Sequence, residues 1–186
     1  MRTMPFQIAL LVFLAGSLYF DARRRTIPNW LTLGVLPAAP ALWASWSRHA
    51  AGAFGVPGPV LFAGLSVAGA LVCAAVPLVL FRLNMMGGGD VKLLACVGAL
   101  ALPGPGLLVE WLSFLLAALL LPARLAYHGR LMATVVRATS AMANPLRAEG
   151  RRRPMPEAMS ERVRLTPFVL VAAIAATLFE RAGGVG

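Results

Sequence analysis

Six apolar segments, separated by short polar connections, constrain this chain more than any other feature. They run from about Met4 to Phe20, Trp30 to Trp46, Pro59 to Phe81, Val91 to Pro103, Leu107 to Tyr127 and Leu165 to Phe179. A helix crosses the bilayer core with roughly 20 apolar residues, and lipid tolerates only a backbone that satisfies its own hydrogen bonds. Of the 186 residues, 59% are hydrophobic and only 13% are charged. This is more apolar surface than a soluble domain of that length can bury. We therefore predict an all-α integral membrane protein, a polytopic bundle of about six transmembrane helices forming one domain over residues 1–186.

The basic residues indicate how the bundle is oriented in the membrane. The chain holds 17 Lys and Arg against 7 Asp and Glu, a net charge of +10. If the N-terminus lies outside, all but three of these cations fall in the inside loops. The three outside cations are Arg2, Arg48 and Arg181. The positive-inside rule then predicts an N-out/C-out topology in the cytoplasmic membrane. Headgroup contact and topology account for the positive charge, so we expect no nucleic-acid partner.

The longest inside loop, residues 128–164, carries eight arginines and three glutamates. We interpret it first as a solvated basic loop that sets topology, and alternatively as a contact for anionic lipid headgroups or a partner. The two cysteines, Cys73 and Cys96, lie inside apolar segments with no CxxC spacing and no neighbouring histidine. We therefore expect them to pack in the core, and we expect neither a metal nor a cofactor.

The chain contains only two aspartates, Asp21 and Asp90. Asp21 closes the first apolar segment and Asp90 opens the fourth, so the predicted topology puts both at the cytoplasmic edge. Carboxylates at such positions are costly and indicate function by default. Two neighbouring carboxyls that share one proton can activate water for peptide hydrolysis. The structural alternatives are an interfacial Asp21 paired with a nearby arginine and an Asp90 that caps its helix.

Two short motifs accompany the aspartates. Gly87, Gly88 and Gly89 directly precede Asp90, and we expect them to allow positive φ angles and the close approach of a substrate backbone. Pro28 suits the first turn of the second helix, and Asn29 can form a local hydrogen bond. The structural alternatives are a flexible turn for the three glycines and a helix entry for the segment around Pro28.

These motifs resemble those of the type IV prepilin peptidases. The family's GxGD motif is similar to the run Gly87-Gly88-Gly89-Asp90-Val91-Lys92-Leu93-Leu94-Ala95. The segment from Asp21 to Ile27-Pro28-Asn29 resembles the family's first aspartate segment, and Thr166-Pro167-Phe168 resembles the start of its final helix. The resemblance implies a bacterial or archaeal aspartic endopeptidase of the cytoplasmic membrane with Asp21 and Asp90 as catalytic residues. It further implies that Gly87, Gly88, Gly89, Lys92, Pro28 and Asn29 support the site.

The same resemblance implies a substrate. Members of the family remove the short leader of prepilins and pilin-like single-span proteins at the cytoplasmic face. Larger members also carry an N-terminal CxxC region linked to methylation, which has no counterpart here, so we expect a peptidase-only enzyme similar to those serving Flp/Tad pili. Pilin identity and oligomeric state stay open.

Two other functions remain possible on the sequence. The first is a presenilin-like intramembrane protease of other single-span proteins, since such proteases share the GxGD motif. The second is a non-enzymatic membrane scaffold or small transporter in which both aspartates are caps or ion ligands. Glu110, the other acid inside an apolar segment, is expected to be a boundary residue facing headgroups, with a proton or ion path as the alternative.

Overall fold

The computed structural model describes residues 4–24, 26–48, 56–83, 86–127 and 165–183, and its regular elements are six α-helices. They are α1 (Met4–Arg24), α2 (Asn29–Trp46), α3 (Gly58–Arg82), α4 (Gly88–Ala101), α5 (Pro103–Tyr127) and α7 (Thr166–Gly183). Each coincides with one of the six apolar segments. The all-helical expectation is therefore confirmed, whereas the basic loop 128–164 lies outside the described residues.

Three of the described helices are long and apolar enough to cross a membrane by length and composition. These are the stretches Pro5–Arg24, Gly58–Arg82 and Pro103–Leu120, and Thr166–Phe179 is a shorter apolar helix. Helix α4 has 14 residues and rises only about 21 Å, less than the hydrocarbon core of about 30 Å. The chain is thus a helical protein with segments suited to a membrane, and the number of six spans and the orientation stay predictions.

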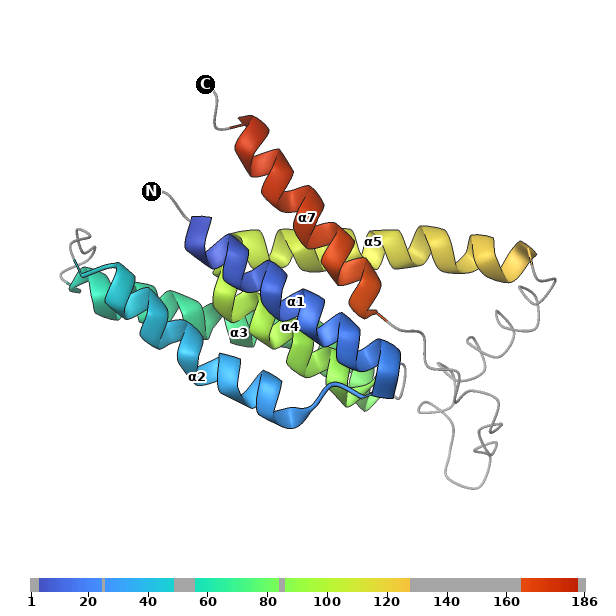
Figure 1. Ribbon diagram of the computed structural model, residues 1–186, viewed down its shortest axis with the longest axis horizontal. Coiled ribbons are helices and arrows are strands. Elements are labelled where there is room, and N and C mark those ends of the chain that lie inside the picture. Colours follow the sequence, from blue (N-terminus) through green and yellow to red (C-terminus); the bar gives the residue numbers. More distant parts are fainter. Residues whose placement is uncertain (1–3, 25, 49–55, 84–85, 128–164, 184–186) are drawn as a thin grey trace.

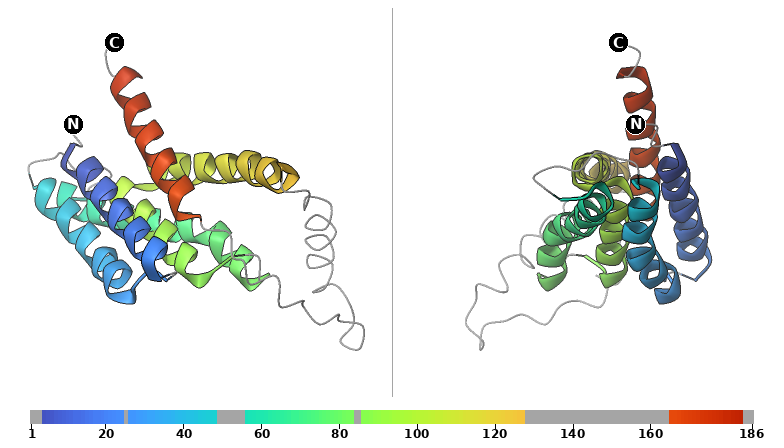
Figure 2. Two further views of the ribbon diagram at one scale, coloured as in Figure 1. Left: turned by 45° about the vertical axis from the view of Figure 1, so that its right-hand side comes forward. Right: turned by 90° about the vertical axis from the view of Figure 1, so that its left-hand side faces the viewer.

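Helix α4 forms the centre of the bundle. Every residue from 93 to 100 is buried, and α4 packs against α1, α2, α3 and α5 (Figure 1). Figure 2 shows α1, α2 and α3 surrounding it, with α5 and α7 crossing on the remaining side. Small side chains explain this position, because they let helix backbones approach closely where lipid gives no hydrophobic driving force. The closest approach is between Gly69 of α3 and Gly98 of α4, where an added Cβ would lie 2.2 Å from the opposite carbonyl oxygen.

The C-terminal end of α4 is held by side chains from its neighbours. The last carbonyl groups of a helix lack partners within that helix. Ser66 Oγ donates to the Ala99 oxygen at 2.7 Å, and Trp43 Nε1 donates to the Leu100 oxygen at 3.2 Å. Leu102 then turns the chain with a φ of 68°, and α5 begins at the next residue. The break is one residue long, whereas the apolar segments of the sequence had left residues 104–106 as the connection.

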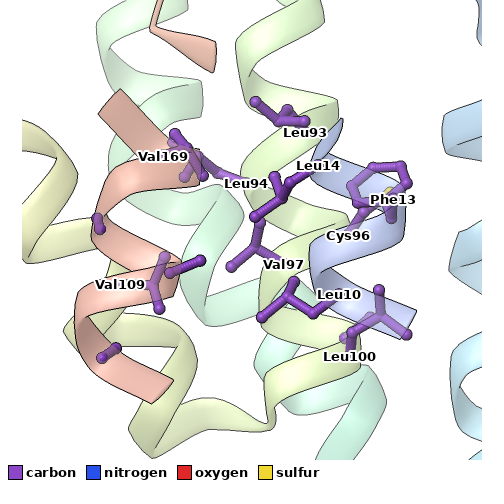
Figure 3. Close-up of a cluster of buried hydrophobic side chains, with 14 of the residues drawn as sticks. Leu10, Phe13, Leu14, Leu93, Leu94, Cys96, Val97, Leu100, Val109 and Val169 are labelled. Carbon is purple, nitrogen blue, oxygen red and sulfur yellow. The ribbon is translucent and has the colours of Figure 1, made fainter. Parts of the chain in front are cut away.

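The main hydrophobic core lies between α1, α4, α5 and α7. Figure 3 shows Leu10 beside Leu100 and Leu14 beside Leu94, with Val109 and Val169 completing the cluster. All six side chains are almost fully buried. The α1–α4 contact is antiparallel, since residue numbers rise along one helix as they fall along the other. The C-terminal end of α1 therefore lies at the same end of the bundle as the first turn of α4.

Candidate active site

Asp21 continues the buried face of α1. Leu10, Leu14, Ser17 and Asp21 follow one another at intervals of three or four residues, so they share one side of the helix. All four are buried, Asp21 with 9% of its surface exposed. Oδ2 of Asp21 and Oγ of Ser17 have no hydrogen-bond partner among the described residues. A buried polar atom without a partner costs free energy and calls for a functional explanation.

Asp21 is buried, and Arg25, four residues after it, lies outside the described residues, so pairing with that arginine stays untested. The neighbouring Arg23 and Arg24 are exposed, and the Arg23 guanidinium lies over the Tyr19 ring, 5.5 Å from its centroid. Asp21 instead points along the inward face of its helix. The carboxyl is thus held inside the bundle near the C-terminal end of α1.

Asp90 belongs to the first turn of α4 but does not cap the helix. The N-cap is Gly87, and Asp90 is the third helical residue, its backbone N–H donating to the Gly87 oxygen at 3.1 Å. Its side chain lies on the same side of α4 as Leu93, Val97 and Leu100, which follow it at intervals of three and four. The interpretation of Asp90 as an N-cap is therefore wrong. As an acid in the first turn it still interacts favourably with the helix dipole.

The packing register brings the ends that carry Asp21 and Asp90 together. Leu14 of α1 lies level with Leu94 of α4 (Figure 3). Asp21 is two turns beyond Leu14, and Asp90 is about one turn before Leu94, so both lie past the same end of the α1–α4 seam. Because each aspartate extends the face of its helix that forms this seam, the two carboxyl groups belong to one region of the molecule.

The three glycines before Asp90 do not have the backbone conformation that we expected. Gly87 has a φ of −78°, and neither Gly88 nor Gly89 has a positive φ, because both are helical. The expected left-handed backbone is therefore wrong. What the glycines provide is room: a Cβ on Gly88 would lie 3.4 Å from the Phe81 ring, whereas a Cβ on Gly89 would meet nothing within 4 Å. The exposed backbone at Gly89 is thus open beside Asp90.

Pro28, Asn29 and Lys92 meet at the same end of the bundle. Pro28 is the N-cap of α2, one residue before the helix rather than in its first turn, and its oxygen accepts from Leu31 N–H at 3.1 Å. Lys92 Nζ donates to Asn29 Oδ1 at 2.9 Å. The sequence had singled out both residues separately, and the fold joins them across 63 positions.

Positive charge gathers at this end as well. The exposed Arg23 and Arg24 end α1, the exposed Arg82 ends α3, and Lys92 lies in the second turn of α4. At the opposite end of the described helices, Arg48 follows α2. The asymmetry agrees with the topology predicted from the charges, in which the end with the aspartates faces the cytoplasm.

Glu110 departs from the expected headgroup position. It is 3% exposed, so its carboxyl group is enclosed by protein. It lies in α5 beside Cys73 of α3, one turn after Gly106, which packs against Gly98. The interpretation of Glu110 as a boundary residue facing headgroups is therefore wrong, because its side chain is enclosed by protein. Within the ranges that the structure describes, no three His, Cys, Asp or Glu side chains gather into a metal site.

One member of the region was missed in the sequence. Ser17 lies one turn before Asp21 on the same buried face, fully enclosed, and its hydroxyl has no partner in the part of the chain that the structure describes. The i, i+4 spacing of two polar residues within an apolar helix was the available signal.

The comparisons with known proteins concern the same part of the chain. The family model described as the type IV leader peptidase family matches residues 8–122, which include both aspartates and the three glycines. Neither the curated proteins nor the solved structures gave a match. The matched segment covers α1 to α4 and most of α5, and it ends before α7.

Proposed function

The chain belongs to the type IV leader peptidase family, and from this premise we propose that it is a membrane-embedded aspartic endopeptidase with Asp21 and Asp90 as its catalytic pair. One observation carries the proposal: the two aspartates of the chain extend the two faces of one antiparallel helix seam and lie at the same end of it. Oδ2 of Asp21, buried and without a hydrogen-bond partner among the described residues, supports it further, because a catalytic water can take that place.

The mechanism follows from two neighbouring carboxyl groups that share one proton. The ionised carboxylate takes a proton from a water molecule, and the water oxygen attacks the carbon of the scissile peptide bond. The protonated carboxyl donates a hydrogen bond to the peptide oxygen and stabilises its developing charge. The carbon–nitrogen bond then breaks as the leaving nitrogen takes up the proton that the first carboxylate removed from water, and the pair again shares one proton. No metal or cofactor takes part.

The proposed substrate is a prepilin or pilin-like single-span protein, cut at the cytoplasmic face before its apolar helix. The apolar helix of such a substrate is suited to lie against the lipid-facing helices, and the open backbone at Gly89 leaves space for an extended leader beside Asp90. The exposed arginines around the site would repel a basic leader, so anionic headgroups are proposed to neutralise them. The proposed location is the cytoplasmic membrane of a bacterium or archaeon, with the site facing the cytoplasm.

The deciding experiment coexpresses the enzyme with a prepilin-like substrate and follows leader removal by gel shift and N-terminal sequencing. Asp21→Asn and Asp90→Asn keep the side-chain shape and remove the carboxylate. We expect both to abolish cleavage while still inserting in the membrane. Glu110→Gln is the matched control, since it makes the same change at a buried acid outside the site, and it should cleave normally.

Each other outcome selects a different conclusion. Normal cleavage by Asp21→Asn or Asp90→Asn would remove that residue from the catalytic pair. If wild type leaves several prepilins uncut but cleaves other single-span proteins, the presenilin-like alternative replaces the prepilin substrate.

A further inference from the structure

The hydrogen bond between Lys92 and Asn29 ties the start of α4 to the start of α2, close along the chain to both aspartates. Asp90 lies two residues before Lys92, and Asn29 begins α2 just eight residues after Asp21. The bond therefore provides a short path from Asp90 through Lys92 to Asn29 and from there along the chain to the last turns of α1. We infer that this bond is a positioning contact, which sets where Asp21 lies relative to Asp90; the inference rests on the proposed function.

The orientation of Lys92 separates this role from direct catalysis. Residues two apart on a helix point to nearly opposite sides, so Lys92 faces away from Asp90. Asp90 extends the face of α4 that packs on α1, whereas Lys92 reaches α2 through Asn29. The ammonium group thus acts on the site through the position of α2.

The bond is one of the side-chain hydrogen bonds that join α2 to α4. Cys96 Sγ donates to the Thr32 oxygen at 3.3 Å, one turn further along both helices, and Trp43 Nε1 donates to the Leu100 oxygen at the far end. The bonds from Cys96 and Trp43 are buried, and the bond from Lys92 is exposed. An exposed polar contact adds little stability. Its loss should therefore change the geometry of the site without unfolding the bundle.

Small changes of position are sufficient to slow a reaction that depends on two carboxyl groups. A displacement of about 1 Å from productive geometry can cost about a hundred-fold in rate. Since the connection from Asp21 to Asn29 is short, a shift of the α2 N-terminus passes directly to the end of α1. Ile27, in this connection, packs against the hydrophobic core and limits the shift. We therefore expect a loss in kcat of about ten-fold when the bond is removed.

The test measures kcat and KM for leader cleavage by the purified, detergent-solubilised enzyme. Lys92→Met and Asn29→Leu remove the donor and the acceptor at nearly constant size. We expect each to lower kcat about ten-fold with KM unchanged, and the double variant to be no worse than either single one. Lys92→Arg keeps a donor and should restore most of the rate. Trp43→Phe is the matched control, because it removes one α2–α4 hydrogen bond far from the site, and it should keep the wild-type kcat.

Several results would overturn the inference. If Lys92→Met raises KM while Asn29→Leu matches wild type, Lys92 contacts the substrate itself. If Trp43→Phe lowers kcat as much as Lys92→Met, the effect is a general loosening of the bundle. If Asp90→Asn is inactive while Lys92→Met keeps the wild-type kcat, the inference fails and the proposed function stands.

A second measurement needs no activity and so remains decisive if the proposed function fails. Spin labels at the exposed positions Arg24 and Arg82 report the distance between the ends of α1 and α3. We expect a narrow distance distribution in wild type, a broader or shifted one in Lys92→Met, and recovery in Lys92→Arg. The same distribution in all three proteins would refute a positioning role.

Discussion

Gly69 and Gly98 cross so closely that a Cβ added to either would lie 2.2 Å from the carbonyl oxygen of the other. Backbone atoms on both sides of the contact leave no flexible side chain that could move aside. The crossing fixes the distance between α3 and α4, and Gly106 of α5 joins it, since its own Cβ would lie 3.0 Å from the Gly98 Cα. Because these glycines have no side chains, the backbones of the three helices can pack closely at this crossing.

Gly98→Ala is expected to lower the free energy of unfolding by about 1–3 kcal/mol, the usual cost of an added methyl group in a packed core. Thermal unfolding of the purified protein in detergent measures the loss. Gly64→Ala is the control on α3, because an added Cβ there meets nothing within 4 Å. A Gly98→Ala protein as stable as Gly64→Ala would contradict the close crossing.

Glu110→Gln is expected to keep or raise the thermal stability, because a neutral amide replaces a buried carboxyl group. Asp21→Asn also replaces a buried carboxyl group and should likewise keep or raise stability, yet abolish cleavage. The two variants therefore separate the effect of a buried acid on stability from its role in cleavage. A marked loss of stability in Glu110→Gln would indicate that the carboxylate has an essential partner.

Gly89→Ala is expected to fold normally and to be more stable by up to about 1 kcal/mol, since alanine favours a helix and open space surrounds the position. If a substrate backbone lies against Gly89, cleavage by this variant should fall through a higher KM. Melting temperature and steady-state kinetics measure the two effects. Unchanged kinetics would place the substrate elsewhere.

The predicted orientation is testable at two exposed arginines at opposite ends of the bundle. Single cysteines at Arg48 and Arg82 are treated with a membrane-impermeant maleimide in intact cells. We expect labelling at position 48 in intact cells and at position 82 only after permeabilisation. The native Cys73 and Cys96 are buried and should add little background. The reverse pattern would invert the topology and move the site to the outer face.

Much of the helical framework could be predicted because a lipid environment permits few backbone conformations. A backbone without water must satisfy its own hydrogen bonds, so each apolar segment had to become a helix. The boundaries were less accurate at Gly88 and Pro103, where glycine and proline suggested loops and tertiary packing instead extended the helices. The number of spans could not be read from α4, whose 14 residues are short for a bilayer but buried by protein from residue 93 to 100.

The candidate residues followed from composition, but their relationships did not. Two aspartates in an otherwise apolar chain stand out without any structure, as do three glycines in a row. The burial of Ser17 and Glu110 and the bond from Lys92 to Asn29 depend on how helices turn toward one another. A pattern along one helix specifies its own faces but not which neighbour each face meets.

The sequence by itself determined the class of protein, the six helices and the residues able to do chemistry, because hydropathy and residue type are local properties. The tertiary structure decided that α4 lies at the centre and that Asp21 and Asp90 extend one seam. It also decided that Glu110 is enclosed rather than facing headgroups. These outcomes depend on contacts between helices far apart in the chain, such as α1 with α7, and on the close packing of small residues at the helix crossings.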